Sequence, residues 1–357
     1  MSSHFHPLRV IEVTRDTADA VVLTLAPAEP DGAPFAFAPG QHLTLRADIA
    51  GEDVRRNYSL CVAPGEGLRV AVKRVAGGRF STWVTQALAR GDVIEAMPPR
   101  GHFTWDFAPA AARRYVMIAG GSGITPILSL LRTGLAREPL SQFTLLYGNC
   151  SSGAIMFLEE LAALKDRYID RFQLYHFLTA EADDVVLFNG RLDAHRLAQV
   201  LGSLVDPAHI DAAFICGPGA MMDAAERALV EAGVDPAAVL VERFTTGEVS
   251  GEALAQVRAA SEAAAGTPIA VTMDGRRRTI AFAADQGNIL DSARAAGLPA
   301  PFACKAGVCA TCRARLVSGE VRMAVNYGLS ADEVAAGYIL TCQAVPVGEG
   351  VAIDYDA

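Results

Sequence analysis

Hydrophobic and polar residues alternate over the first third of the chain in short segments that predict β-strands. The segments HLTLRA, NYSLCV and LRVAVKRV have the period of two that is typical of strands with one buried face. Turn signals separate them, at Pro39-Gly40, Pro64-Gly65, Gly77-Gly78 and Pro98-Pro99. Up to about Trp105 the pattern therefore predicts an antiparallel barrel or sandwich.

From Arg114 to Phe244 the pattern changes to nearly continuous apolar runs that alternate with helical stretches. The apolar runs are YVMIAG, FTLLYG, FQLYHFL, AAFICG and VLVERF, and the helical stretches include ILSLLRTGLA and AMMDAAERALVEAG. Apolar strands that alternate with helices predict an α/β domain, in which a parallel sheet is covered on both faces.

The last third of the chain begins with a predicted break between domains, since residues 247–266 are rich in Ala, Gly and Glu and have no core-forming pattern. Such a composition predicts a linker that is at most partly helical. The segment IAVTMDGRRRTIAF follows, and its Asp274-Gly275 pair between two strand-like runs predicts a tight hairpin. We therefore expect three domains, at residues 1–107, 108–246 and 267–357.

Composition and charge limit the classes of partner. The 357 residues are 51% hydrophobic and carry a formal net charge of −9, which disfavours nucleic acid and anionic membranes as partners. No apolar run reaches the roughly 18 residues of a membrane span, and the N-terminus lacks the pattern of a signal peptide, so we expect a cytoplasmic protein. In that compartment seven cysteines favour ligands, reactive thiols or buried small side chains over disulfides.

Four of these cysteines have a spacing that suits an iron–sulfur cluster. Cys304, Cys309 and Cys312 in CKAGVCATC are followed by Cys342, which matches the plant-type pattern C-x4-C-x2-C…C. Four thiolates can complete two tetrahedral irons, and the small residues between them let backbone N–H groups approach the cluster sulfurs. The alternative is a structural zinc site, which more often has two C-x2-C pairs.

Glycines at two strand ends in the α/β region predict a nucleotide site. The strand RRYVMIAG runs into GSGITP, where Gly120, Gly121 and Gly123 allow the backbone to approach a pyrophosphate at a helix N-terminus. A later strand end, FICGPGAMM, is expected at the same edge of the sheet. Cys216 in this segment either contacts a nicotinamide ring or is a buried small hydrophobic residue.

The first region holds two further candidate binding segments. In RRNYSL, Arg56 and Tyr58 share one strand face, so that the guanidinium could hold a phosphate and the ring could stack on a flat heterocycle, with Ser59 at a polar edge. In GGRFST, Gly78 and Ser81 precede a helical pattern and form a second candidate phosphate cradle.

Taken together, the motifs RNYS, GGRFST, GGSGITP, CGP and CKAGVCATC…C resemble those of the ferredoxin–NADP reductase superfamily, in members with a C-terminal plant-type ferredoxin domain. The resemblance covers essentially the whole chain. It implies an antiparallel β-barrel flavin domain, an α/β nucleotide domain and an α+β ferredoxin domain of the β-grasp type. Within the superfamily, stretches such as PGQHLTL and ADEVAAGY are most similar to the reductase subunits of ring-1,2-phenylacetyl-CoA epoxidases.

The resemblance also implies roles for individual residues. Arg56 would bind an FAD phosphate, Tyr58 would stack on the isoalloxazine, and Ser59 would form a hydrogen bond near N5. The flavin pyrophosphate would be held by Gly78, Arg79, Phe80, Ser81 and Thr82. The nicotinamide nucleotide would be bound by Gly121, Ser122, Gly123, Ile124 and Thr125, and by Cys216 and Gly217 of the CGP motif. Thr125 and Cys216 would lie close to the nicotinamide, where hydride transfer takes place.

One position departs from the family pattern. Related reductases often have an arginine just after Tyr-Gly-x, where it can meet the 2′-phosphate of NADPH, but this chain has Cys150, followed by Ser151 and Ser152. The two serines can still donate hydrogen bonds to a phosphate. NADPH is therefore the expected substrate and NADH stays possible, because the bidentate grip of arginine is missing.

The function implied by the resemblance is electron transfer from NAD(P)H through FAD and a [2Fe-2S] cluster to a separate di-iron oxygenase, the phenylacetyl-CoA epoxidase. The chain itself has no Glu-x-x-His pair of the kind that holds a di-iron centre. Two alternatives stay open. One is the reductase of another aromatic-ring oxygenase or of a hybrid-cluster protein, and the other is a redox-sensing module that binds nucleotide without turnover.

Overall fold

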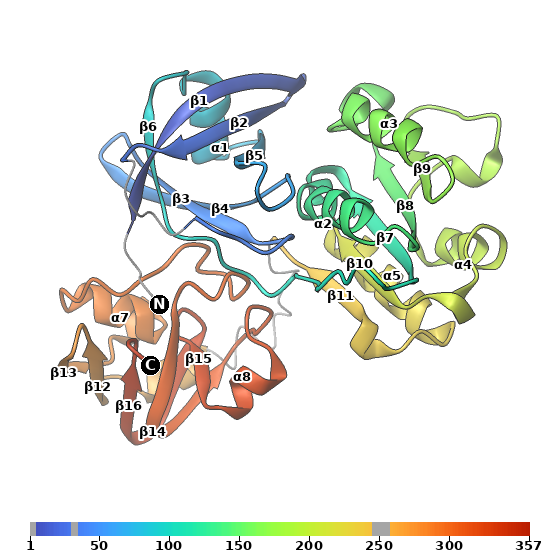
Figure 1. Ribbon diagram of the computed structural model, residues 1–357. Helices are drawn as coiled ribbons and strands as arrows, with labels where there is room; N and C mark the ends of the chain where they lie inside the picture. Colours follow the sequence, from blue (N-terminus) through green and yellow to red (C-terminus); the bar gives the residue numbers. More distant parts are fainter. Residues whose placement is uncertain (1–4, 30–34, 245–257) are drawn as a thin grey trace. The chain divides into compact units, whose positions relative to one another are not determined.

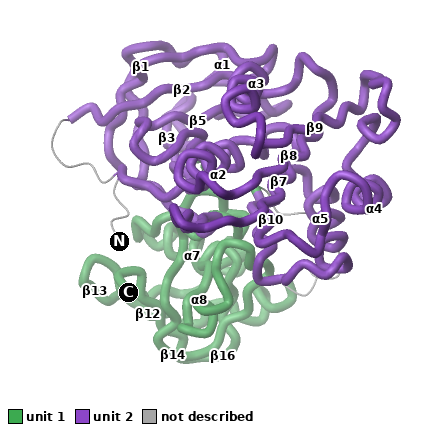
Figure 2. Tube along the Cα trace, turned by 45° about the vertical axis from the view of Figure 1, so that its right-hand side comes forward, with its two compact units in different colours: residues 1–4, 55–57, 244–357 green, residues 5–54, 58–243 purple. Residues whose placement is uncertain are grey.

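The computed structural model describes residues 5–29, 35–244 and 258–357 (Figure 1). The chain divides into two compact units (Figure 2). One contains Phe5–Val54 and Tyr58–Arg243, and the other contains Arg55–Asn57 and the described part of Phe244–Ala357. The regions predicted to bind flavin and nicotinamide nucleotide thus lie together, and the boundary between them at residue 107 stays a prediction.

The N-terminal region forms a six-stranded antiparallel sheet, as its alternating pattern predicts. The strands are β1 (His6–Thr17), β2 (Ala20–Pro27), β3 (His42–Ile49), β4 (Glu52–Ser59), β5 (Leu68–Lys73) and β6 (Val93–Ala96). Their order is β4-β3-β6-β1-β2-β5, and one helix, α1 (Arg79–Gln86), follows β5. A bridge between Leu60, just after β4, and Val70 in β5 joins the two edges of the sheet and closes it into a barrel.

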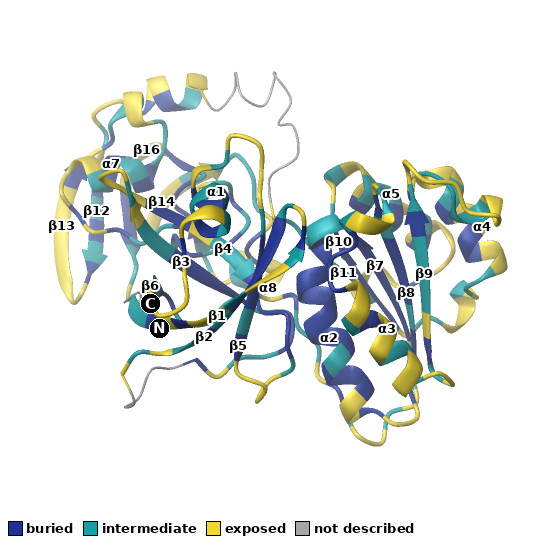
Figure 3. Cartoon of the chain, turned by 90° about the horizontal axis from the view of Figure 1, so that it is seen from above, coloured by how far each residue is buried: buried dark blue, intermediate teal, exposed yellow. Residues whose placement is uncertain are grey.

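The next region forms a five-stranded parallel sheet with helices on both faces (Figure 3), which confirms the α/β prediction. The strands are β7 (Arg114–Gly120), β8 (Gln142–Asn149), β9 (Phe172–Leu178), β10 (Ala212–Cys216) and β11 (Val239–Glu242), in the order β11-β10-β7-β8-β9. The helices are α2 (Ile124–Arg137), α3 (Leu158–Arg167), α4 (Ala194–Ser203) and α5 (Gly219–Glu231). Because β7 and β10 are neighbours, their glycine-containing ends lie side by side.

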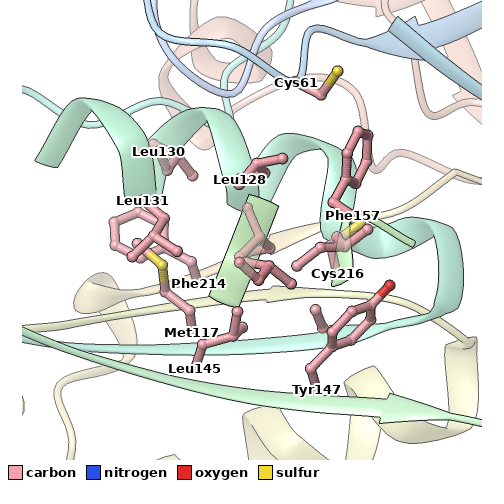
Figure 4. Close-up of a cluster of buried hydrophobic side chains, with 14 of the residues drawn as sticks. Cys61, Met117, Leu128, Leu130, Leu131, Leu145, Tyr147, Phe157, Phe214 and Cys216 are labelled. Carbon is pink, nitrogen blue, oxygen red and sulfur yellow. The ribbon is translucent and has the colours of Figure 1, made fainter. Parts of the chain in front are cut away.

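Helix α2 joins this sheet to the barrel. The buried cluster around α2 includes Cys61 of the N-terminal region and Leu128 of the helix itself (Figure 4). Phe103 and Phe107 of the N-terminal region belong to the same cluster. Ser129 of α2 is fully buried, and its Oγ accepts a hydrogen bond from the Gly40 N–H at 3.3 Å and donates one to the Val62 carbonyl at 2.6 Å. The two regions therefore share one hydrophobic core.

The C-terminal region forms a five-stranded mixed sheet of the expected β-grasp type. Its strands are β12 (Pro268–Met273), β13 (Arg276–Ala281), β14 (Arg313–Met323), β15 (Tyr338–Leu340) and β16 (Ala344–Asp354), in the order β13-β12-β16-β14-β15. The helices are α7 (Ile289–Ala295) and α8 (Ala331–Ala335). Asp274 and Gly275 both have positive φ and form the predicted hairpin between β12 and β13.

The predicted linker at 247–266 lies partly outside the described residues. In its described part, residues 258–263 are helical, and Ser261 and Ala264 are buried beside the C-terminal sheet. Across the parts of the chain that the structure describes, no helix is long and apolar enough to span a bilayer.

Candidate functional site

The RNYS segment at the end of β4 presents polar and aromatic groups that suit a flavin. The ring of Tyr58 lies 5.7 Å from that of the buried Phe80, at an angle of 30°. Ser59 is only 3% exposed, and its Oγ has no hydrogen-bond partner among the described residues. A buried hydroxyl without a partner costs about 1–3 kcal/mol, which a heteroatom of a bound heterocycle would recover. Arg56 is exposed and donates to the carbonyl of Arg55 at 2.7 Å.

The N-terminus of helix α1 suits a pyrophosphate. No side chain caps the helix at Gly78, so its first N–H groups are open to an anion. A Cβ atom at Gly78 would lie 2.6 Å from Ser81 Oγ and 3.1 Å from the Val75 carbonyl oxygen, so a larger residue would have to displace the Ser81 side chain. Ser81 Oγ accepts a hydrogen bond from the Val75 N–H at 3.1 Å and donates to the Gly78 carbonyl at 3.3 Å. The Ser81 hydroxyl thus stabilises the turn from Val75 to Gly78, and the backbone N–H groups of α1 are the donors for a pyrophosphate.

Two other predicted flavin ligands also have contacts within the protein. Arg79 pairs with the carboxylate of Glu52 and donates to the carbonyl of Ile49 at 2.7 Å. The N–H of Thr82 donates to the Gly78 carbonyl at 3.0 Å. Their contacts with flavin phosphates therefore stay predictions.

Replacing Tyr58 with alanine is expected to weaken flavin binding. Stacking of an aromatic side chain on a flat base is worth about 1–3 kcal/mol, so the flavin dissociation constant should rise about tenfold or more. Flavin content after gel filtration, measured by absorbance at fixed protein concentration, checks this. Tyr58→Phe keeps the ring and should retain flavin. If Tyr58→Ala keeps its full flavin content and turnover, Tyr58 does not belong to the site.

The glycines of GGSG and CGP pack backbone against backbone at the carboxyl edge of the parallel sheet. Gly121 has φ of +52° and nothing within 4 Å of an added Cβ, so the chain turns there beside open space. A Cβ at Gly123 would lie 2.1 Å from the carbonyl oxygen of Cys216, and one at Gly217 would lie 2.9 Å from the Gly120 nitrogen. The N-terminus of α2 has no side-chain cap, so this loop fits a nucleotide pyrophosphate.

Thr125 and Cys216, predicted to lie near the nicotinamide, are both buried at this edge. The Thr125 hydroxyl donates to the Ser122 carbonyl at 3.0 Å. Burial and the nearby charge of Glu242 raise the pKa of the Cys216 thiol well above its ordinary value, so the thiol is protonated. Because its side chain is fully enclosed, contact between Cys216 and a nicotinamide ring stays a prediction.

Glu242 is a residue at this edge that the sequence analysis did not single out. It ends β11, is paired in register with Cys216, and its side chain is 17% exposed. Its Oε1 lies 3.9 Å from Nδ1 of His42. The signal in the sequence was the acidic residue at the end of the run VLVE, since the carboxyl ends of parallel strands meet at one edge of a sheet.

In the loop after β8, the hydrogen-bond donors of Ser152 have a partner within the protein, and the predicted contacts with a phosphate stay predictions. Cys150 is exposed, and its carbonyl accepts a hydrogen bond from the Ala180 N–H at 2.8 Å. Ser152 donates from its backbone N–H and its hydroxyl to the carboxylate of Glu181, at 3.0 and 3.1 Å. A phosphate could reach the Ser152 donors only after Glu181 moved away. Ser151 is extended and half-buried, so its phosphate contact stays a prediction.

The four cysteines of the C-terminal region lie together as two hydrogen-bonded pairs, Cys304 with Cys309 and Cys312 with Cys342. The bond from Cys304 lowers the pKa of Cys309, and the bond from Cys312 lowers that of Cys342. Within the described residues, no three His, Cys, Asp or Glu side chains are grouped as ligands of a single ion. Four thiolates in two pairs would suit the two irons of a [2Fe-2S] cluster.

The loop that carries three of these cysteines is held in an unusual conformation. Lys305 and Ala310 have φ of +52° and +50°, and Gly307 has φ of +72°. Positive φ at a residue other than glycine costs on the order of 1 kcal/mol, so the fold sustains strain here. The Ala306 N–H points at the sulfur of Cys304, with a distance of 3.2 Å between nitrogen and sulfur. The residues therefore fit a cluster whose sulfurs accept backbone hydrogen bonds.

Comparisons with known proteins agree with this geometry. Family models match the chain as an oxidoreductase FAD-binding domain at residues 7–105, an oxidoreductase NAD-binding domain at 117–227 and a 2Fe-2S iron-sulfur cluster binding domain at 271–347. The protein is thus an oxidoreductase that binds FAD, a nicotinamide nucleotide and a [2Fe-2S] cluster.

Proteins that match this chain along its full length define its family more closely. The chain is 45% identical to a subunit of the 1,2-phenylacetyl-CoA epoxidase of Escherichia coli K12, covering 99% of this chain and 98% of that protein. It is 34% identical to the ferredoxin reductase component of 3-ketosteroid-9-alpha-monooxygenase of Mycobacterium tuberculosis H37Rv, covering 100% and 97%. The solved structure of phthalate dioxygenase reductase covers 98% of both chains with 26% identity and a TM-score of 0.59. The chain belongs to the family of FAD- and [2Fe-2S]-containing reductase components of oxygenases.

Proposed function

We propose that the protein is the reductase component of a phenylacetyl-CoA epoxidase, and that it supplies this di-iron oxygenase with electrons from NAD(P)H. The observation that supports the partner is the 45% identity to a subunit of the Escherichia coli epoxidase over nearly the whole of both chains. The two cysteine pairs, in one chain with the flavin and nucleotide segments, support the route of the electrons.

The residues of the chain bind and align the groups that carry the electrons. When bound, FAD would supply the acceptance of a hydride and the release of single electrons, and the [2Fe-2S] cluster would supply one-electron transfer. Tyr58 and Ser59 would position the flavin ring, and the loops at Gly121 and Gly217 would hold the nucleotide. Ser129 of α2 forms hydrogen bonds with the barrel, and the GGSG loop before α2 belongs to the same compact unit as Tyr58 and Ser59 of β4. This favours a fixed alignment of the nicotinamide and the flavin for hydride transfer.

Anaerobic titration of the purified protein with NADPH, and separately with NADH, tests the electron route. Visible absorption should show the flavin bleaching, and electron paramagnetic resonance should then show a rhombic signal from a reduced [2Fe-2S] cluster. A flavin that bleaches without any cluster signal would contradict the assignment of Cys304, Cys309, Cys312 and Cys342.

A partner assay tests the choice of oxygenase. The protein is mixed with a phenylacetyl-CoA epoxidase oxygenase component, NAD(P)H and phenylacetyl-CoA, and the epoxide product is measured. The comparison reaction contains the oxygenase component of 3-ketosteroid-9-alpha-monooxygenase and its steroid substrate in place of the epoxidase component and phenylacetyl-CoA. Turnover with the steroid oxygenase at an equal or higher rate would contradict the proposed partner while leaving the electron route intact.

Replacing Cys150 with arginine is expected to shift preference toward NADPH. A guanidinium at this position could grip the 2′-phosphate and offset the negative charge of Glu181 nearby. The ratio of kcat/KM for NADPH to that for NADH should rise about tenfold, which corresponds to about 1.4 kcal/mol. Cys150→Gln has similar length without charge and should leave the ratio near that of the wild type. An unaltered ratio in Cys150→Arg would show that this position does not meet the 2′-phosphate.

A further inference from the structure

We propose that Gln343 is a positioning residue of the cluster site that acts through Cys342. Its side chain raises the reduction potential of the cluster by donating a hydrogen bond to the Cys342 sulfur, an inference that rests on the proposed function. Gln343 lies in the segment CQA between β15 and β16, directly after the fourth cysteine. Its backbone N–H donates to the Leu340 carbonyl at 2.9 Å, and its carbonyl accepts from the Ala324 N–H at 3.0 Å. Because both backbone groups are held, the side chain starts from a fixed position beside Cys342.

The amide group of Gln343 joins two parts of the site that are distant in the sequence. Its Nε2 lies 3.6 Å from Sγ of Cys342 and donates to the carbonyl oxygen of Lys305 at 3.1 Å, within the loop that carries the other three cysteines. A carbonyl oxygen only accepts, so the atom beside Lys305 is the amide nitrogen and not the amide oxygen. This nitrogen has two hydrogens, one for the carbonyl and one for the sulfur.

The cysteine loop packs directly against this side chain. A Cβ atom at Gly307 would lie 3.0 Å from Cγ of Gln343 and 3.1 Å from the Val325 carbonyl oxygen, so the loop approaches Gln343 closely because Gly307 has no side chain. Gly307 also has φ of +72°, and the neighbouring Lys305, whose carbonyl accepts from Gln343, has φ of +52°. The amide therefore meets the loop where its backbone conformation is unusual.

The bond from Gln343 stabilises negative charge on the Cys342 sulfur. Cys342 is 5% exposed, so water screens the N–H dipole only weakly. The pKa of Cys342 lies below its ordinary value, chiefly because of the bond from Cys312 and in part because of the bond from Gln343, while burial opposes both. Reduction adds negative charge to an iron–sulfur cluster, and hydrogen bonds to its sulfurs are among the factors that set its potential. A donor to a ligand sulfur favours the reduced state, so its removal lowers the potential.

The side-chain donor differs from the backbone donors of the site. The Ala306 N–H, 3.2 Å from the sulfur of Cys304, is present whichever residue occupies position 306, proline excepted. The Nε2 donor depends on the identity of residue 343. Position 343 is therefore one at which a substitution changes the potential while all four thiolate ligands stay in place.

The test measures the reduction potential of the cluster in Gln343→Met, which has an unbranched side chain of similar length without a donor. The full-length flavoprotein is titrated anaerobically with dithionite and redox mediators, and the electron paramagnetic resonance signal of the reduced cluster is recorded at each potential. At the wild-type midpoint, the ratio of reduced to oxidised cluster should fall about five- to tenfold, and a tenfold change equals about 59 mV for one electron. Gln286→Met is the matched control, because it removes an exposed amide of the same region that donates to Asp285, and it should leave the potential unchanged.

Other outcomes would overturn the inference. An unchanged potential in Gln343→Met would do so, and a lower Tm or iron content with an unchanged potential would assign Gln343 to a structural bond with the Lys305 carbonyl alone.

If Tm and potential both fall, or if Gln343→Met does not fold, pulsed electron paramagnetic resonance decides. The reduced wild type, labelled with ¹⁵N in its glutamine side-chain amides, should show a ¹⁵N coupling to the cluster. Gln343→Lys retains a donor, so it should keep a potential at least as high as that of the wild type and lose this coupling. Absence of the coupling in the wild type, or its persistence in Gln343→Lys, would reject the inference.

These measurements separate the inference from the proposed function. If neither NAD(P)H nor dithionite produces a [2Fe-2S] signal in the wild type, the cluster assignment fails, and the proposed function with it. If the wild type gives the signal and Gln343→Met has the same potential, only the role of Gln343 fails.

Discussion

Replacing Cys309 with serine is expected to abolish electron transfer from NAD(P)H to cytochrome c and to the oxygenase, while reduction of ferricyanide at the flavin continues. Cys309 is 4% exposed and paired with Cys304, so a hydroxyl in its place would leave one iron with only one of its two thiolate ligands. Cytochrome c reduction should fall about a hundredfold or more, since loss of a direct ligand exceeds the 10–100-fold cost of losing an outer-shell contact.

The measurement is the ratio of cytochrome c reductase to ferricyanide reductase activity, with iron content determined on the same samples. Cys61→Ser is the matched control, because it alters another buried thiol, one that donates to the Arg69 carbonyl at 3.3 Å, and serine retains that donor. The control should keep both activities. Equal loss of both activities in Cys309→Ser would contradict the assigned order of electron transfer.

Replacing Gly123 with alanine is expected to destabilise the nucleotide region and to abolish measurable nucleotide binding. The added Cβ would lie 2.1 Å from the Cys216 carbonyl oxygen and 2.5 Å from its carbon, and backbone cannot move as a flexible side chain can. Separating the two loops would disturb the edge that holds the nucleotide. We expect the free energy of unfolding to fall by about 3 kcal/mol, near the upper end of effects from overpacking.

Urea unfolding and titration with NADP⁺ check this expectation. Gly202→Ala is the control, because Gly202 lies in helix α4 with nothing within 4 Å of an added Cβ. It should be neutral or more stable by up to about 1 kcal/mol, since alanine favours the helix. If the Gly123→Ala protein is as stable as the Gly202→Ala control, the GGSG loop and the CGP segment can separate at little cost, which would contradict this expectation.

The sequence was sufficient for the parts of this fold that depend on local pattern. Alternation identified the barrel strands, apolar runs identified the parallel sheet, and Asp274-Gly275 identified the hairpin, because each depends on side-chain periodicity or on backbone conformations that few residues adopt. The placement of the GGSG loop beside the CGP segment could also be predicted from the sequence, since the carboxyl ends of neighbouring parallel strands share an edge of the sheet.

Other features depend on contacts between residues that are distant in the sequence. The pairing of Cys312 with Cys342 joins positions 30 residues apart, and spacing alone does not say which thiols share an iron. The occupation of the Ser152 donors by Glu181 depends on two loops that follow different strands. The burial of Ser129 between Gly40 and Val62 depends on packing between regions, for which the local pattern carries no signal.

The contacts of Ser129 have a consequence for exchanging parts between relatives. The motifs suggest that a barrel from one reductase could be joined to the nucleotide domain of another at about residue 107. In this chain, however, the Val62 carbonyl and the Gly40 N–H, both from the barrel, are satisfied by a side chain of α2, and Phe103 and Phe107 complete the core of the α/β sheet. A chimaera joined there would preserve its motifs yet lose these partners. The flavin and nucleotide regions should therefore be transferred together, as one unit, when a chimaera is made.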